Sequence, residues 1–313
     1  MSKPKRCSDE EFVRDFNLLG PAGLARKLNI AARAIYSRRN TLEKHGHQLV
    51  APSKRAAGFG HHRLEWTIPD GEVLIGSDAH IWPGDEPVMM RAFRLFAKKR
   101  NPKAVILNGD IFDGANISRH AQIMWEKSPG VAKELEAVQD WLNKLVLGSP
   151  VNIPMAWPQG NHDARFETKL SANASEFANV KGMHLKDHFS NRLTPCWSVW
   201  INDTVVVKHR QKGGIHATHN NTVGAGKSMV TGHLHSAKVT PFTDYNGTRW
   251  GVDCGCLADP YGPQFLGYTE DGFRNHRAGF CVLTFVNGAL LQPELCLVWD
   301  EDHVQFRGEI IRV

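Results

Sequence analysis

The chain has 313 residues, of which 42% are hydrophobic and 22% charged, and its 38 Lys and Arg residues against 32 Asp and Glu residues give a net charge of +6. This composition excludes a disordered chain, and no run approaches the about 20 apolar residues of a membrane span. We therefore expect a cytoplasmic protein without a membrane partner. Six cysteines in this length are too few for a disulfide scaffold, so we expect reduced thiols.

The positive charge is concentrated at the N-terminus. Residues 1–60 hold 12 Lys and Arg against 5 Asp and Glu, a net charge of +7, whereas the remainder is close to neutral. Either a module that binds a polyanion such as DNA or a solvated charged face would account for this excess. Residues 51–62 are rich in Ala, Gly and basic residues and predict a linker. We therefore divide the chain into a basic module at 1–50, a linker at 51–62 and a body at 63–313.

The basic module has the apolar spacing of two short helices that pack across a turn at Asn29. The segment GLARKLNIAARAIYSRRNTLEKHG resembles the helix-turn-helix superfamily, with Arg38 where that pattern usually has an apolar residue. The resemblance implies that a second helix near residues 31–43 enters a DNA major groove and presents Arg33, Arg38 or Arg39. Helical pairs of this kind also bind proteins, so both partners remain open. The apolar positions are Leu24, Ala25, Leu28, Ile30 and Ile35.

The body alternates strands with helices. Apolar runs at 72–78 and 104–110 predict buried strands on either side of a helix at 87–99, and a helix at 131–147 precedes a strand within 152–161. Further strands are expected at 204–209 and 228–233. Asn-Gly pairs at 246–247 and 287–288 predict hairpins in the last third. The pattern predicts an α/β fold with mixed sheets flanked by helices.

Polar residues that can bind metals follow five of these hydrophobic runs, at the strand ends where α/β proteins place their sites. Any one of the five would be weak, but their joint occurrence predicts a metal centre. In chain order they are Asp78 and His80; Asp110 and Asp113; Asn161, His162 and Asp163; His209; and His233 and His235.

The predicted ligands are two carboxylates, one amide oxygen and four imidazoles, without a thiolate: Asp78, Asp110, Asn161, His80, His209, His233 and His235. Nitrogen and oxygen donors favour Mn, Fe, Zn, Co or Ni. Seven ligands exceed the need of one tetrahedral ion and predict two divalent ions, with Mn as our first expectation. Such a centre keeps a positive charge and would attract phosphate. We prefer His209 to His216 and His219 because it directly ends a β-branched run.

These blocks resemble the calcineurin-like metallophosphoesterase superfamily, whose signature reads DxH, GDxxD, GNHD or GNHE, H and GHxH, over about residues 72–260. The resemblance implies a four-layer αββα sandwich of two mixed sheets. It also implies that Asp110 bridges two metals, that His162 stabilises the transition state or protonates the leaving oxygen, that Asp163 orients its ring, and that Asp113 supports a ligand. By position, Asp78, His80 and His235 would hold one metal and Asn161, His209 and His233 the other.

The substrate class is indicated by departures from one branch of this superfamily. Protein Ser/Thr phosphatases carry Arg at the position of Gly114 and Glu at that of Asp163. These departures favour a phosphodiesterase or nuclease that acts on nucleic acid over a protein phosphatase. Residues 163–209 are similar to phosphoesterases of bacteriophages. The alternatives are a phosphomonoesterase or small-nucleotide hydrolase whose N-terminal helices contact protein, and a DNA-binding regulator with an inactive phosphoesterase body.

Overall fold

The computed structural model of the chain describes residues 7–47, 49, 63–119, 127–269, 272 and 275–313. The chain divides into two compact units, Met1–Gly60 and His61–Val313. The linker expected at 51–62 lies outside the described residues. None of the described helices is long and apolar enough to cross a membrane.

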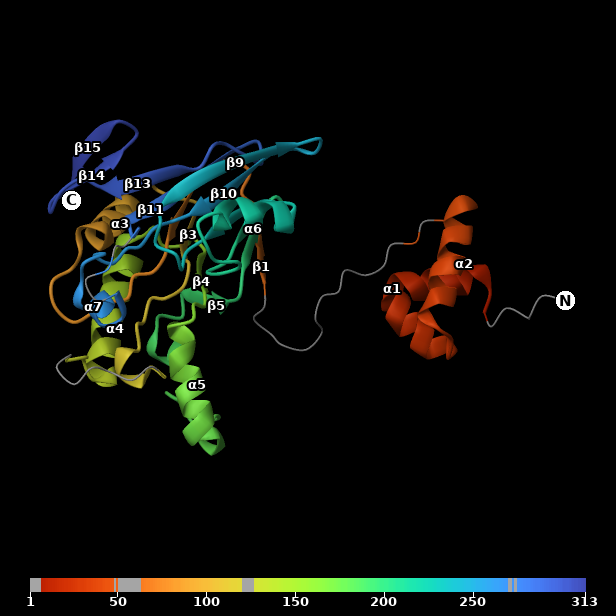
Figure 1. The fold of residues 1–313 in the computed structure, drawn as a ribbon, viewed down its shortest axis with the longest axis horizontal. Coiled ribbons are helices and arrows are strands. Elements are labelled where there is room, and N and C mark those ends of the chain that lie inside the picture. The colour runs from red at the N-terminus through yellow and green to blue at the C-terminus, as the bar shows by residue number, and fades with distance from the viewer. Residues whose placement is uncertain (1–6, 48, 50–62, 120–126, 270–271, 273–274) are drawn as a thin grey trace. The chain divides into compact units, whose positions relative to one another are not determined.

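The first unit contains two helices, α1 (Asp9–Leu28) and α2 (Ala32–Lys44), as Figure 1 shows. Ser8 begins α1 in a reciprocal capping box with Glu11, so this helix starts earlier than the apolar spacing alone indicates. Asn29 ends α1 with φ of 49°, in the left-handed conformation that the turn prediction requires. The expected packing across the turn is present, with a small core of Phe12, Phe16, Leu24, Ala25, Ile35, Leu42 and Leu49.

The second unit is built on two mixed sheets (Figure 1). The six-stranded sheet has the order β1–β6–β7–β8–β10–β9, with bounds Leu64–Trp66, Val199–Ile201, Val205–Val207, Ser228–Thr231, Gly247–Asp253 and Lys238–Asp244. The nine-stranded sheet has the order β15–β14–β13–β11–β2–β3–β4–β5, and β12 (Ala289–Leu290) pairs with β11. Its bounds in that order are Glu309–Arg312, His303–Phe306, Glu294–Val298, Gly279–Val286, Gly71–Gly76, Ala104–Leu107, Met155–Pro158 and Leu193–Cys196.

Helices cover the outer face of each sheet. On the nine-stranded sheet lie α3 (Val88–Lys99), which contacts β2, β11, β13 and β14, and its neighbour α4 (Val131–Gly148). On the six-stranded sheet lies α6 (Ala217–Ala225), which contacts β8, β9 and β10. The other helical segments of this unit are η1 (Ala115–Ile117), α5 (Asp163–Asn173), η2 (Ser175–Phe177), η3 (Leu185–His188) and α7 (Pro263–Thr269).

Strand β2 shows why the sheets stack in this way. Its consecutive side chains are buried on opposite faces: Leu74 joins the core under α3 and α4, whereas Val73 and Ile75 join the core between the sheets. The inter-sheet core includes residues of both sheets, such as Val207 and Val230 of the six-stranded one. Two helix-covered faces and one shared core make the four-layer αββα sandwich that the resemblance implies.

Strand direction places the site. In the nine-stranded sheet β2, β3, β4 and β5 run parallel, and in the other sheet β7 and β8 do. The carboxyl ends of these neighbouring strands therefore open on common sheet edges, from which loops project.

Most predicted elements of the body are present, including the helices at 87–99 and 131–147 and both C-terminal hairpins. The sequence analysis did not identify β1, β5, β6, β14 and β15, which have three or four residues each and show too little periodicity. All six cysteines are free thiols, and Cys254 and Cys256 are buried in the core.

Candidate metal centre

The seven predicted ligands all follow the carboxyl ends of strands. Asp78 and His80 follow β2, Asp110 follows β3, and Asn161 follows β4. These three strands are neighbours in the nine-stranded sheet. From the other sheet, His209 follows β7, and His233 and His235 follow β8. Because the two sheets stack on a shared core, the structure brings side chains from different sheets that are 157 residues apart, Asp78 and His235, into direct contact.

The backbone of these loops is unusual. Five of the seven residues have a positive φ: Asp78 at 53°, His80 at 37°, Asp110 at 52°, His233 at 71° and His235 at 54°. Each left-handed non-glycine residue costs about 1–3 kcal/mol and persists only where the surroundings enforce it. Such strain is concentrated at functional sites, and its recurrence here marks these strand ends as one site.

The first group of ligands comprises Asp78, His80 and His235, whose ligand atoms lie within 4.8 Å of one another. The Nε2 atom of His235 lies 3.0 Å from Oδ1 of Asp78, and the Nε2 atom of His80 lies 3.8 Å from the same oxygen. The buried Nε2 atom of His80 has no hydrogen-bond partner. An unpartnered imidazole nitrogen that faces a carboxylate in a buried site is what a divalent cation would satisfy.

The second group comprises Asp110, His209 and His233, again within 4.8 Å. Asn161 adds its Oδ1 atom at 3.3 Å from Nε2 of His209. The Nδ1 atom of His209 donates to the carbonyl oxygen of Asn108 at 2.7 Å, so Nε2 is left as the nitrogen with a lone pair for a metal. His216 precedes α6 as its N-cap residue and His219 lies on α6, and neither belongs to a candidate metal group of the described residues.

Asp110 lies between the two groups. Its Oδ2 atom is 3.1 Å from Nε2 of His209 in the second group and 3.9 Å from Nε2 of His80 in the first. Its Oδ1 atom accepts a hydrogen bond from the backbone of His162 at 2.7 Å. Gly160 is necessary for this approach, because a Cβ at that position would lie 2.0 Å from Oδ1 of Asp110. This placement is the one that a bridging carboxylate needs.

The charges of the site favour the ionised forms of Asp78 and Asp110 and the protonated forms of His80 and His209. Burial alone would raise the pKa of Asp78, but the rings of His235 and His209 hold it well below its usual value, and His209 and His162 do the same for Asp110. Burial opposes protonation of the histidines, yet Asp113 and Asp78 raise the pKa of His80 to about 10, and Asp110 and Asp78 raise that of His209 to about 9. A metal would displace these protons.

Asp113 joins two imidazoles behind the ligands. Its Oδ1 atom lies 2.8 Å from Nδ1 of His80 and 2.8 Å from Nδ1 of His162. The bond to His80 turns Nε2 of that ring toward Asp78 and Asp110. A third compact group consists of His80, Asp113 and His162. In this group Oδ1 of Asp113 is already the partner of both imidazole rings.

The expectation that Asp163 orients the ring of His162 is wrong, because Asp113 makes that contact. Asp163 is fully buried at the start of α5 and accepts hydrogen bonds from the backbone N–H groups of residues 110, 111, 112 and 160. The indole of Trp157 donates to it at 2.8 Å. Asp163 therefore positions the two loops that carry Asp110 and His162.

Arg165 is a residue of the site that the sequence analysis missed. Its Nη2 atom donates to Nε2 of His162 at 3.1 Å, and its Nη1 atom donates to the carbonyl oxygen of Asp113 at 2.9 Å. A Cβ at position 114 would lie 3.4 Å from the Arg165 side chain, so this Arg occupies the space beside Gly114. Its spacing of three residues from His162, one turn along a helix, was the available signal.

The cluster also includes His276. Its ring lies 4.6 Å from that of His235, and both rings contact Phe265. Since no motif includes His276, only the fold reveals this contact.

In the first unit, the three predicted DNA contacts differ in their surroundings. The guanidinium of Arg38 binds the carbonyl oxygens of Cys7 and Ser8 and the carboxylate of Asp9, and it lies 4.5 Å from the ring of Phe12. Arg38 therefore joins the two helices, which corrects its predicted role and explains the departure from the helix-turn-helix pattern. Arg33 is exposed, and Arg39 pairs with Glu43 on its own helix.

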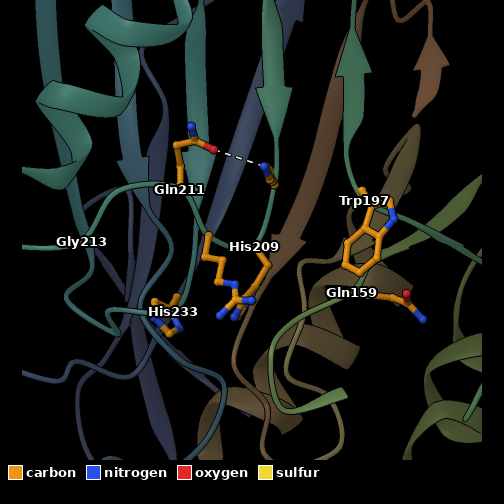
Figure 2. A pocket seen from close by; sticks show the side chains of 8 residues that line it. Gln159, Trp197, His209, Gln211, Gly213 and His233 are labelled. Carbon is orange, nitrogen blue, oxygen red and sulfur yellow. Dashed lines mark hydrogen bonds between the residues drawn. The ribbon is translucent and has the colours of Figure 1, made fainter. Parts of the chain in front are cut away.

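A cavity of about 530 Å³ opens beside the second group of ligands (Figure 2). His209 and His233 form part of its wall, together with residues that follow β4, β5 and β7. The metal centre is thus accessible from a hollow large enough for a small-molecule ligand.

The fold and the site together define a metal-binding α/β sandwich with a histidine-rich centre. The family model of the calcineurin-like phosphoesterases matches residues 71–239, and the chain belongs to this family. The match includes both ligand groups, so the family supports a metal-dependent phosphoester hydrolase. The identity of the metal does not follow from the match.

No curated protein sequence matches the chain. Among solved structures, Vps29 of Entamoeba histolytica in complex with zinc has 14% identity and a TM-score of 0.40 over 77% of this chain and 98% of its own. The phosphoesterase YfcE of Escherichia coli has 16% identity and a TM-score of 0.34 over 77% and 96%. The nuclease MPE of Pseudomonas putida has 15% identity and a TM-score of 0.32 over 71% and 86%.

Proposed function

We propose that the protein is a two-metal phosphodiesterase that cleaves nucleic acid. The observation that carries this proposal is the convergence of seven nitrogen and oxygen donors from five strand ends into two adjoining groups, with Asp110 between them. The donors fit divalent ions because five of the seven are buried, one imidazole nitrogen has no partner, and no thiolate is among them. Mn is our first choice among the metals that such donors bind.

Residues of the chain would hold the metals, position the reacting groups and transfer a proton. Divalent ions held by these side chains would supply Lewis acidity toward a phosphoryl oxygen and make a water molecule more acidic. Asp113 holds the rings of His80 and His162, and Asp163 holds the loops beneath them. In the structure His162 accepts a hydrogen bond from Arg165 through Nε2. When Arg165 turns to a phosphate oxygen, that nitrogen becomes free to exchange a proton with the leaving oxygen.

A phosphomonoesterase is the second candidate, and Arg165 is the observation that favours it. The sequence lacks an Arg at position 114, which argues against a clamp for a dianionic phosphate. Arg165 occupies the adjoining space and would supply a guanidinium from another element. We favour the diester because Nη1 of this guanidinium is bonded to the carbonyl oxygen of Asp113, which leaves only Nη2 to turn from His162 to a phosphate oxygen.

We assign nucleic-acid targeting to the first unit, as part of the same proposal. The face of α2 opposite Ile35 and Leu42 presents exposed donors and no acidic side chain, which suits contact with phosphates and bases. Its exposed residues at helical spacing are Arg33, Tyr36, Ser37, Asn40 and Lys44. A partner protein that uses the same face is the alternative.

The activity test compares a diester with a monoester that has the same leaving group. Purified protein with Mn²⁺ is assayed on bis(4-nitrophenyl) phosphate, 4-nitrophenyl phosphate and DNA, and EDTA serves as the control for metal dependence. We expect a higher kcat/KM on the diester together with DNA cleavage. A preference for the monoester without DNA cleavage would establish the second candidate instead, and absence of all turnover would refute both.

A further inference from the structure

The cavity beside the metal centre has features that the metal ligands do not require. It lies where strands of both sheets end: Gln159 follows β4, Trp197 follows β5, and Lys208 and Arg210 follow β7. His209 and His233 belong to the second ligand group and also line the cavity. The cavity therefore adjoins the position that a phosphate bound at this group would occupy. Its volume of about 530 Å³ falls within the range of ordinary ligand sites.

The cavity is lined by cations without nearby acids. Lys208 donates to Oε1 of Gln211 at 3.1 Å, a neutral partner that leaves the positive charge uncompensated. Arg210 is exposed, and no carboxylate of the described residues forms an ion pair with it. Among the residues that the structure describes, no Asp or Glu lines the cavity. Two uncompensated cations beside a metal centre favour a ligand with more than one negative charge.

Trp197 adds an aromatic surface to this charged cavity. Its side chain is 46% exposed, although the preceding Cys196 is buried in the sheet. Figure 2 shows its indole at one end of the cavity next to Gln159, with Gln211 and His233 toward the other end. An exposed indole beside cations is the combination with which proteins bind unstacked bases and their phosphates, and the two glutamine amides can pair with base edges.

We propose that this cavity binds the nucleotide unit adjacent to the bond that is cleaved, with its base against Trp197 and its phosphate on Arg210 and Lys208. The inference rests on the proposed phosphodiesterase function and specifies its substrate. An acidic peptide would use the two cations but would leave the indole unused. The base must be unstacked to reach Trp197, so a single strand is the expected form of nucleic acid.

Two diesters with the same leaving group test the subsite. Methyl 4-nitrophenyl phosphate lacks a nucleoside, whereas the 4-nitrophenyl ester of thymidine 5′-phosphate carries one. We expect the wild-type chain with Mn²⁺ to prefer the thymidine ester, and Trp197→Ala to lower the ratio of the two kcat/KM values by about 5- to 100-fold, the range expected for a lost base stack. Trp299→Ala is the matched control, because Trp299 is 61% exposed and does not line the cavity.

Binding provides a readout that does not need turnover. Calorimetry of the dinucleotide pTpT with the full-length Asp110→Asn variant and Mn²⁺ should give a Kd that rises about 10-fold when Arg210→Gln is added, since a charge-assisted contact is lost. Arg312→Gln, at another exposed Arg, is the control and should leave the Kd unchanged. Comparison with an octathymidylate shows whether a polymer or a free dinucleotide is the better ligand.

The outcomes separate the subsite from the activity. If Trp197→Ala retains the ester preference, or if Trp197→Ala and Arg210→Gln both bind pTpT as the parent does, the subsite is wrong even when the enzyme cleaves diesters. If the wild-type chain cleaves neither ester, the proposed activity fails. The binding measurement then decides the subsite by itself.

Discussion

The role of Asp163 as an organiser of the two loops leads to a quantitative prediction for Asp163→Asn. The carboxylate accepts five hydrogen bonds: Oδ2 accepts from Asp110 N, Gly160 N and Trp157 Nε1, and Oδ1 accepts from Ile111 N and Phe112 N. An asparagine keeps one oxygen and places an NH₂ group against the other donors. Two or three buried donors therefore lose their acceptor, whichever way the amide turns.

Each such donor costs about 1–3 kcal/mol, so we expect Asp163→Asn to lower the free energy of unfolding by about 2–9 kcal/mol. Because the same loops carry Asp110 and His162, the number of Mn ions bound per folded chain should also fall. Urea denaturation followed by circular dichroism measures the first quantity, and elemental analysis of the dialysed protein measures the second.

Asp259→Asn is the matched control, since Asp259 is exposed and its side chain accepts a hydrogen bond from Tyr261 N. That substitution should change the free energy of unfolding by less than about 0.5 kcal/mol. If Asp163→Asn were no more destabilising than Asp259→Asn, the carboxylate would not be holding the loops, and the reasoning would be refuted.

Three further predictions follow from the charges. Asp110→Asn should abolish diester cleavage while preserving the circular dichroism spectrum, because it removes the charge between the two ligand groups at nearly constant volume; an equal loss of fold and rate would contradict the assignment. Burial raises the pKa of Glu134 from 4.5 to about 8, so the stability that its protonated form contributes is lost as pH rises through 8. Glu134→Gln should therefore increase the free energy of unfolding by up to about 5 kcal/mol at pH 9 and change it little at pH 4.5. Identical thermal-unfolding profiles of the two proteins at both pH values would disprove this. Combined Arg33→Gln and Lys44→Gln, or deletion of residues 1–60, should weaken DNA binding and flatten its dependence on salt, and an unchanged slope would exclude the first unit as the DNA contact.

Three residues, Asp113, Asp163 and Arg165, show which properties of the site a sequence motif predicts and which depend on the fold. All three lie in or next to signature blocks, and the sequence predicts their residue types and the loops that carry them. Several of their contacts join residues 49 to 53 positions apart in the chain, as in the contacts of His162 with Asp113 and of Asp163 with Asp110. Spacing along a sequence cannot determine which of two neighbouring carboxylates reaches an imidazole, since this depends on how the loops after β3 and β4 pack against each other.

By itself the sequence determined the alternating strands and helices, the layered fold class and the order of the candidate ligands, because each ligand directly ends a hydrophobic run whose period is visible locally. Only the tertiary structure decided that Arg38 joins two helices, that Arg165 faces His162, and that Trp197 and Arg210 line one cavity. The physical reason is that burial of a strand is encoded in its own side chains, whereas contacts between loops depend on the pairing and twist of strands distant in the chain.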